Sequence, residues 1–199
     1  MPKTVDQLID LVSSNDGFAR PNWFLVELPQ INEYPLLSSR ELNLLCNSTQ
    51  LPGKRMLTAE RIIGPRLEKI AYAHVINDIS LSFFLLNNAK IKEYFDVWRS
   101  LIQSDNTYEV QYRDTYSREL LVSQLKKPQN FSYDDFDNEI IYQVRLIDAF
   151  PVSLHDMRVS NESGNIIQRF DVDFAFTNWE PVHLSTSTSS NRIINSIIT

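Results

Sequence analysis

The residues of this sequence that could bind a metal or act as bases are three histidines and a few acidic pairs. His74, His155 and His183 lie far apart in the chain, without partners at the spacing of metal ligands. Metal sites and activated nucleophiles are recognised by short motifs, and the H-x-x-x-H, G-x-S-x-G and G-x-x-x-x-G-K-[ST] patterns are absent. The histidines therefore predict neither a metal site nor a catalytic centre.

Two acidic pairs could imitate the carboxylates of an acid–base site. Asp134 and Asp135 belong to a polar stretch over 132–139, whose composition is typical of a solvated turn. Asp171 and Asp173 alternate with apolar residues, as expected for the polar face of a strand. We therefore expect no enzyme, no cofactor and no metal.

Cysteine and glycine counts exclude further kinds of site. The single cysteine, Cys46, rules out an intramolecular disulfide and any multi-cysteine metal site. It ends the apolar run Leu42–Cys46, where we expect a buried and inert thiol. Only four glycines occur, which excludes a glycine-rich phosphate cradle.

The net charge of −6 lies entirely in the second half of the chain. Residues 1–99 hold 11 basic and 11 acidic side chains, whereas residues 100–199 hold 8 and 14. This balance argues against tight DNA binding, which needs clustered Lys and Arg, and an acidic surface would repel a passing duplex. With 199 residues, no leader-like amino end and no apolar run of membrane-spanning length, we expect one soluble domain made in a cytoplasm without export.

The first fifty residues predict one helix and two strands. The helix covers 4–13, begins at a capping Thr4 and carries an apolar stripe of Val5, Leu8, Ile9 and Val12. A strand follows at Trp23–Leu28, then a loop over 29–40 and a second strand at Leu42–Cys46.

The middle of the chain predicts a hairpin, a strand and the best helix. Residues 54–72 form an extended hairpin or long loop bent at Gly64-Pro65. Ile76–Leu86 is a strand with Ser80 and Ser82 on one face, which either meets solvent or lines a wet channel. A helix over about 89–103, capped by Asn88, has an apolar stripe of Ile91, Tyr94, Phe95, Trp98, Leu101 and Ile102.

Further strands are expected at Tyr108–Tyr112, Glu119–Leu125 and Ile140–Asp148, and the clearest one runs from Phe170 to Thr177. The fold class is therefore mainly β, an antiparallel sandwich or barrel with one packed α-helix and a short amino-terminal helix. We expect one domain over 1–180. The polar extension over 181–199 is either disordered or an arm that becomes ordered on a neighbour.

Five segments, taken in order, form one recognisable set. They are Gly17-Phe18-Ala19-Arg20-Pro21-Asn22-Trp23-Phe24-Leu25-Val26-Glu27, Cys46 with Thr49-Gln50-Leu51-Pro52-Gly53, Phe95-Asp96-Val97-Trp98 after Asn87-Asn88, Asp148-Ala149-Phe150-Pro151, and Phe170–Trp179. This set resembles the tail tube protein family of T-even-type contractile-tail phages. Together they span residues 1–180. The chain departs from the family pattern over 105–140 and beyond Trp179-Glu180.

This resemblance implies a structural subunit of the virion tail, assembled in the host cytoplasm. Family members form hexameric rings that stack into a tube inside a sheath, joined to a baseplate, and viral DNA crosses the lumen without specific binding. No membrane or cofactor is involved. A tube initiator or terminator, or the inner tube of a phage-like protein injection system, stays an alternative.

Stacked identical rings need two different complementary ends. A basic set in the predicted hairpin offers one end, and an acidic set in the polar turn offers the other. They are Lys54, Arg55, Arg61, Arg66 and Lys69, against Asp134, Asp135, Asp137 and Glu139. The alternative is that they form two separate solvated loops.

The segment after the first helix is a second candidate contact. It comprises Phe18, Arg20, Pro21 and Asn22, in which proline fixes φ and favours an extended Arg20. Such a link either holds the helix out against a neighbouring subunit or forms a local turn. From a different class, a carbohydrate-binding sandwich would use Trp23, Trp98 and Trp179 as stacking platforms, although Trp98 lies on the apolar helix stripe.

Overall fold

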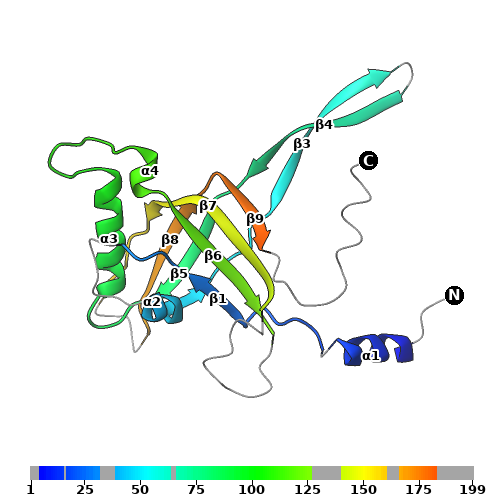
Figure 1. Ribbon diagram of the computed structural model, residues 1–199, viewed down its shortest axis with the longest axis horizontal. Helices are drawn as coiled ribbons and strands as arrows, with labels where there is room; N and C mark the ends of the chain where they lie inside the picture. Colours follow the sequence, from blue (N-terminus) through cyan, green and yellow to red (C-terminus); the bar gives the residue numbers. More distant parts are fainter. Residues whose placement is uncertain are drawn as a thin grey trace.

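The centre of the molecule is one antiparallel sheet that curves into a nearly closed barrel. The computed structural model describes residues 5–15, 17–31, 39–63, 66–126, 140–160 and 166–182. In the seven-stranded sheet the order is β1-β6-β7-β8-β5-β2, with β9 paired to β7. A separate two-stranded hairpin projects from this barrel (Figure 1). The mainly β, antiparallel fold expected from the sequence is confirmed.

The strands and helices have the following bounds. The sheet contains β1 (Phe24–Glu27), β2 (Cys46–Ser48), β5 (Ile79–Phe84), β6 (Arg118–Leu125), β7 (Ile140–Leu154), β8 (Arg169–Ala175) and β9 (Asn178–Val182). The projecting hairpin consists of β3 (Lys54–Ile63) and β4 (Arg66–Ile76). The helices are α1 (Val5–Ser14), α2 (Ser39–Leu45), α3 (Lys90–Ile102) and α4 (Arg113–Tyr116).

Strand β7 is long because it serves both halves of the sheet. One edge pairs with β6, while the other pairs first with β9 over Gln143–Ile147 and then with β8 over Phe150–Leu154. The change of partner falls at Asp148, whose φ of 54° is a left-handed conformation that Asp tolerates better than most residues. Thr177 Oγ1 donates to Asp148 Oδ2 at 3.1 Å and accepts from Arg113 Nη2 at 2.6 Å. These bonds hold the corner where β7 changes partner.

Helix α3 covers one face of β5 and β8 with aromatic side chains. The Phe95 ring lies 5.2 Å from that of Phe83 and 5.9 Å from those of Phe170 and Phe174. Ile91, Tyr94, Phe95 and Trp98 are all buried, so the stripe expected on this helix forms the centre of the core. Tyr94 Oη donates to the Pro29 carbonyl at 2.6 Å, and burial raises the pKa of Tyr94 well above its usual range.

The strand expected at Leu42–Cys46 is wrong over most of its length. Residues 39–45 form helix α2, and only Cys46–Ser48 is extended. A short apolar run cannot be assigned from periodicity alone. Here Leu42 and Leu45, three residues apart, both pack against the core from one side of the helix. Asn43 Oδ1 also accepts a hydrogen bond from the Leu28 amide at 3.2 Å, which ties α2 to the end of β1.

Three other expectations need correction. The expected strand at Tyr108–Tyr112 is absent: only Val110 makes an isolated bridge, and Tyr108 has a φ of 57°, which interrupts an extended chain. The strand expected at Ile76–Leu86 is shorter, because Ile76 is the last residue of β4 and β5 begins only at Ile79. The N-cap of α3 is Ala89 rather than Asn88, although Asn88 Oδ1 still accepts from the Lys90 amide at 3.3 Å.

Candidate assembly surfaces

The β3–β4 hairpin projects from the barrel, and none of its described side chains is buried. Residues 54–72 were expected to form a hairpin or a long loop, and the hairpin is confirmed. In the described part of the chain its two strands pair only with each other, so both outer edges carry unpaired backbone groups. Its exposed large apolar side chains are Met56, Ile62, Leu67, Ile70, Tyr72 and Val75. A two-stranded hairpin is marginally stable alone in water, so this one needs a partner.

The strand register partly neutralises the basic hairpin. Glu60 lies opposite Lys69, and Glu68 lies opposite Arg61. Of the five candidate basic residues, Lys54, Arg55 and Arg66 have no acidic residue opposite them.

At the base of the hairpin, Lys54 Nζ lies 4.8 Å from the centroid of the Trp179 ring in β9, so this lysine ties the hairpin to the barrel. The acidic candidates Asp134, Asp135, Asp137 and Glu139 lie outside the described residues.

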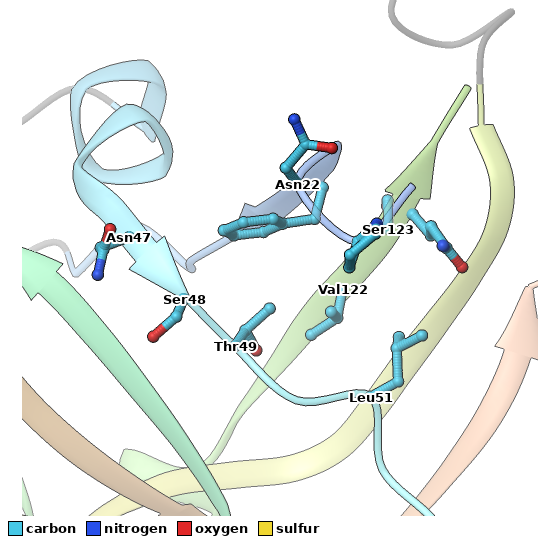
Figure 2. A pocket seen from close by; sticks show the side chains of 10 residues that line it. Asn22, Asn47, Ser48, Thr49, Leu51, Val122 and Ser123 are labelled. Carbon is cyan, nitrogen blue, oxygen red and sulfur yellow. The ribbon is translucent and has the colours of Figure 1, made fainter. Parts of the chain in front are cut away.

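A groove of about 520 Å³ lies where the barrel is not closed by hydrogen bonds, between the sheet ends β1 and β2. Thr49 and Leu51, which follow β2, lie across it from Val122 of β6, and Ser48 also lines it (Figure 2). The candidate neighbour contacts Pro21 and Asn22 also line this groove. The groove is therefore lined by residues from both ends of the sheet, and several of these side chains are apolar.

Phe18 and Arg20 are both exposed, and they lie between this groove and α1. Helix α1 itself buries no side chain, and Val5, Leu8, Ile9 and Leu11 are each more than half exposed. The predicted amphipathic helix is therefore present, but its apolar face meets nothing within the described chain. Figure 1 shows α1 standing apart from the barrel.

A polar sheet face lies on β5 and β8, opposite the face that α3 covers. Ile79, Leu81 and Phe83 point into the core, so Ser80 and Ser82 point the other way. Their register partners on β8 are Asp173 and Asp171. Ser82 and Asp171 also line a shallow depression of about 400 Å³. Hydroxyls and carboxylates dominate this face.

Ser80, Asp173 and His155 lie together on this face, yet their order does not suit nucleophilic catalysis. Ser80 Oγ donates to Asp173 Oδ1, and His155 Nε2 lies 2.7 Å from Asp173 Oδ2. In a catalytic triad the histidine stands between serine and carboxylate and takes the serine proton. Here the carboxylate stands between them, and the serine hydroxyl, followed by the histidine, holds the pKa of Asp173 below its usual range. These contacts therefore connect β5 and β8 to the residue that follows β7.

The other residues that could react or bind a ligand are also packed against the core. Cys46 is half-buried against the core, and burial raises the pKa of its thiol to about 12, as expected of a thiol with little thiolate at neutral pH. Trp98 is fully buried and cannot stack on a ligand. Among the described residues no three metal-binding side chains come together, and no helix there is long and apolar enough to cross a membrane.

Sequence reasoning missed the groove between β1 and β2 and the corner at Asp148. The groove depends on which strands end the sheet, which no local pattern encodes. The corner had one signal: Asp148 and Pro151 interrupt a strand pattern that otherwise continues to Leu154.

Comparison with known proteins shows which family the chain belongs to. The family model for phage tail tube proteins matches residues 19–181. A chain of the anti-feeding prophage cap, the tube terminating cap, is similar in structure with a TM-score of 0.60 and 15% identity, over 84% of this chain and 92% of that one. No curated protein matches the sequence.

Two chains from an extracellular contractile injection system are also similar. One comes from the PVC sheath–tube complex in the extended state, with a TM-score of 0.58 and 16% identity over 92% of this chain and 99% of that chain. The other comes from the PVC sheath/tube terminator, with a TM-score of 0.54 and 16% identity over 81% and 94%. At these identities the structural likeness shows the fold, whereas the family match covers most of the sequence. The chain belongs to the phage tail tube protein family and is a structural subunit of a tail tube.

Proposed function

We propose that copies of this chain form hexameric rings that stack into a tube, through whose lumen viral DNA passes during ejection. The observation that carries the proposal is the β3–β4 hairpin, a pair of long strands that leaves the barrel with both edges open and large apolar side chains exposed. Such a surface in a monomer invites aggregation unless a specific partner covers it. Copies of the same chain would provide that partner in an ordered way.

Ring stacking would use the charges of the hairpin. We propose that its basic residues meet the acidic stretch Asp134, Asp135, Asp137 and Glu139 of a subunit in the next ring. An exposed ion pair contributes only about 0–1 kcal/mol, so these pairs would set register and orientation rather than supply most of the binding energy. The apolar side chains of the hairpin would supply the larger share.

The lumen would be lined by the polar face of β5 and β8. Ser80, Ser82, Asp171 and Asp173 present hydroxyls and carboxylates without a basic cluster. Arg169 lies on the same side of β8 and lines the same depression, but a single cation among these hydroxyls and carboxylates gives phosphates no cationic cluster, so a duplex would slide along the face rather than bind. A sheath and a baseplate would then contact the tube from outside and at its end.

Shortening the hairpin tests the assembly role. Lys54 and Ile76 are register partners, so a short Gly/Ser turn can join them in place of residues 55–75. We expect a folded protein that forms no tubes in negative-stain images. A milder substitution is Ile62→Ser in the hairpin, and its control is Val159→Ser at another highly exposed apolar site. Long tubes from the shortened protein would refute the proposal.

Labelling tests the lumen. In a Cys46→Ser background, Ser82→Cys would carry a maleimide-linked heavy-atom label in assembled tubes, with Ser100→Cys on the outer side of α3 as the control. We expect the Ser82 label inside the wall and the Ser100 label elsewhere. A Ser82 label on the outer wall would assign the polar face to another surface.

A second candidate function is that of a tube-terminating ring. The likeness to a tube terminating cap favours it, since that chain has the same fold over most of both lengths. A terminator would form single rings and would not polymerise alone. Negative-stain images of the purified protein separate the two candidates. The inner tube of a protein injection system would look like a tube in the same images, and the presence of DNA in intact particles would distinguish it.

A further inference from the structure

Two amphipathic elements of this chain, α1 and the β3–β4 hairpin, have no partner for their apolar side chains within the described residues. They carry opposite charge. Helix α1 contains Asp6 and Asp10 and no basic residue, whereas the hairpin strands contain more basic than acidic side chains. Each element thus has an exposed apolar surface, and the two elements have net charges of opposite sign.

One face of the hairpin suits a helix particularly well. Alternation along β3 places Arg55, Leu57, Ala59 and Arg61 on the same side, and their register partners are Val75, Ala73, Ile70 and Glu68. We call this the arginine face. Its middle is apolar, and the two alanines leave room for a helix ridge, while an arginine stands at each end.

The dimensions of the two surfaces agree. The ten residues of α1 are about 15 Å long at 1.5 Å per residue. From Arg55 to Arg61 the strand extends about 20 Å at 3.3 Å per residue. The helix therefore fits lengthwise between the two arginines. On its wheel Asp6 lies about 60° from Ile9, at the margin of the apolar arc, within reach of side chains beside it.

A single copy does not bring these surfaces together. Figure 1 shows α1 and the hairpin well apart, extending from the barrel in different directions. The end of α1 is also held: the Gly17 amide donates to the Val12 carbonyl at 2.9 Å, and Asn15 Nδ2 donates to the Leu11 carbonyl at 2.7 Å. Gly17 has a φ of 101°, which ends the helix with a defined change of direction.

We propose that α1 of one copy docks on the arginine face of the β3–β4 hairpin of a second copy. The apolar stripe of Val5, Leu8, Ile9 and Val12 covers the apolar middle of that face. Asp6, at the margin of the stripe, meets Arg55, which has no acidic residue opposite it. The contact is heterologous, because each copy donates a helix and offers a hairpin, so it propagates from copy to copy. This inference rests on the proposed tube assembly and names one of its contacts.

Disulfide trapping tests the contact directly. In a Cys46→Ser background, one copy carries Leu8→Cys and a separately prepared copy carries Ala59→Cys. We expect an intermolecular disulfide when the two are mixed under assembling conditions. Gln7→Cys, on the polar side of α1, and Thr58→Cys, on the other hairpin face, are the matched controls and should not cross-link. Cross-linking of the controls at the same yield, or none with Leu8→Cys, overturns the proposal.

Charge reversal separates this contact from stacking against the acidic stretch at 134–139. The substitution Arg55→Glu should lower tube yield, and adding Asp6→Lys should restore it if α1 is the partner. Recovery on reversing the acidic stretch instead, with none from α1, overturns this inference but leaves the tube proposal intact. If the unsubstituted protein forms no tubes or rings, the proposed function itself fails.

Discussion

Replacing Trp98 with alanine should strongly destabilise the subunit, because this indole is at the centre of the core. Trp98 is fully buried, its ring lies 5.7 Å from that of Phe174 and 5.9 Å from that of Tyr94, and it stacks on Phe95 at 6.4 Å. Its Nε1–H donates to the Tyr116 carbonyl at 2.9 Å, which holds α4 to α3. Removing a buried tryptophan side chain costs about 3–5 kcal/mol, a large part of the roughly 5–15 kcal/mol available to a domain.

Urea unfolding followed by far-UV circular dichroism measures this loss. The protein should be dilute and unassembled, because assembly adds a concentration-dependent stability. We expect a lower midpoint at an unchanged slope, and a smaller loss of about 1–3 kcal/mol for Trp98→Phe, which keeps a ring but leaves the Tyr116 carbonyl unpaired. A Trp98→Ala protein within about 1 kcal/mol of the parent would refute the core assignment, since burial effects of this size cannot vanish.

Three further outcomes follow from the same structure. Thr177→Val should cost about 1–2 kcal/mol in urea unfolding, because it removes the bonds to Arg113 and Asp148 that hold the β7 corner; no change would mean that the corner holds without them. The pKa of Asp173 is lowered by a serine hydroxyl and a histidine, so its carboxylate stabilises the fold above about pH 4, and the melting-temperature advantage over Asp173→Asn should shrink as pH falls below that. Because burial raises the pKa of Cys46 from 9.0 to about 12, folded protein should react slowly with a thiol reagent at pH 8 and lose stability between about pH 9 and 12; rapid labelling without unfolding would contradict this.

Local patterns in the sequence were enough to predict the elements with strong periodicity. The stripe on α3, the alternation along β8 and the turn residues of the β3–β4 hairpin each reflect one dominant local preference, and each element formed where expected. The absence of the sequence motifs of metal and nucleophile sites also needed no tertiary structure to recognise. These features depend on residue types at fixed short spacing, which the chain order contains directly.

Short or competing patterns were decided by tertiary contacts. Residues 42–45 became helical because Leu42 and Leu45 face the core from α2, and Tyr108–Tyr112 stayed irregular because no sheet face covers these side chains. Strand β9 follows β8 after a turn at Thr177, and it forms because β7 offers a free edge there. Such choices depend on partners that lie far away in the chain.

By itself the sequence determined a mainly β subunit with an amphipathic amino-terminal helix, a charged hairpin and no motif for catalysis, because composition and periodicity depend only on neighbours in the chain. Only the tertiary structure decided which surfaces are left without partners. Strand pairing decides which strands end the sheet at β1 and β2, which β4 residues lie beside Arg55 and Arg61, and which β8 residues lie beside Ser80 and Ser82. Pairing joins distant segments in one register among many, and that register sets where a second copy can bind.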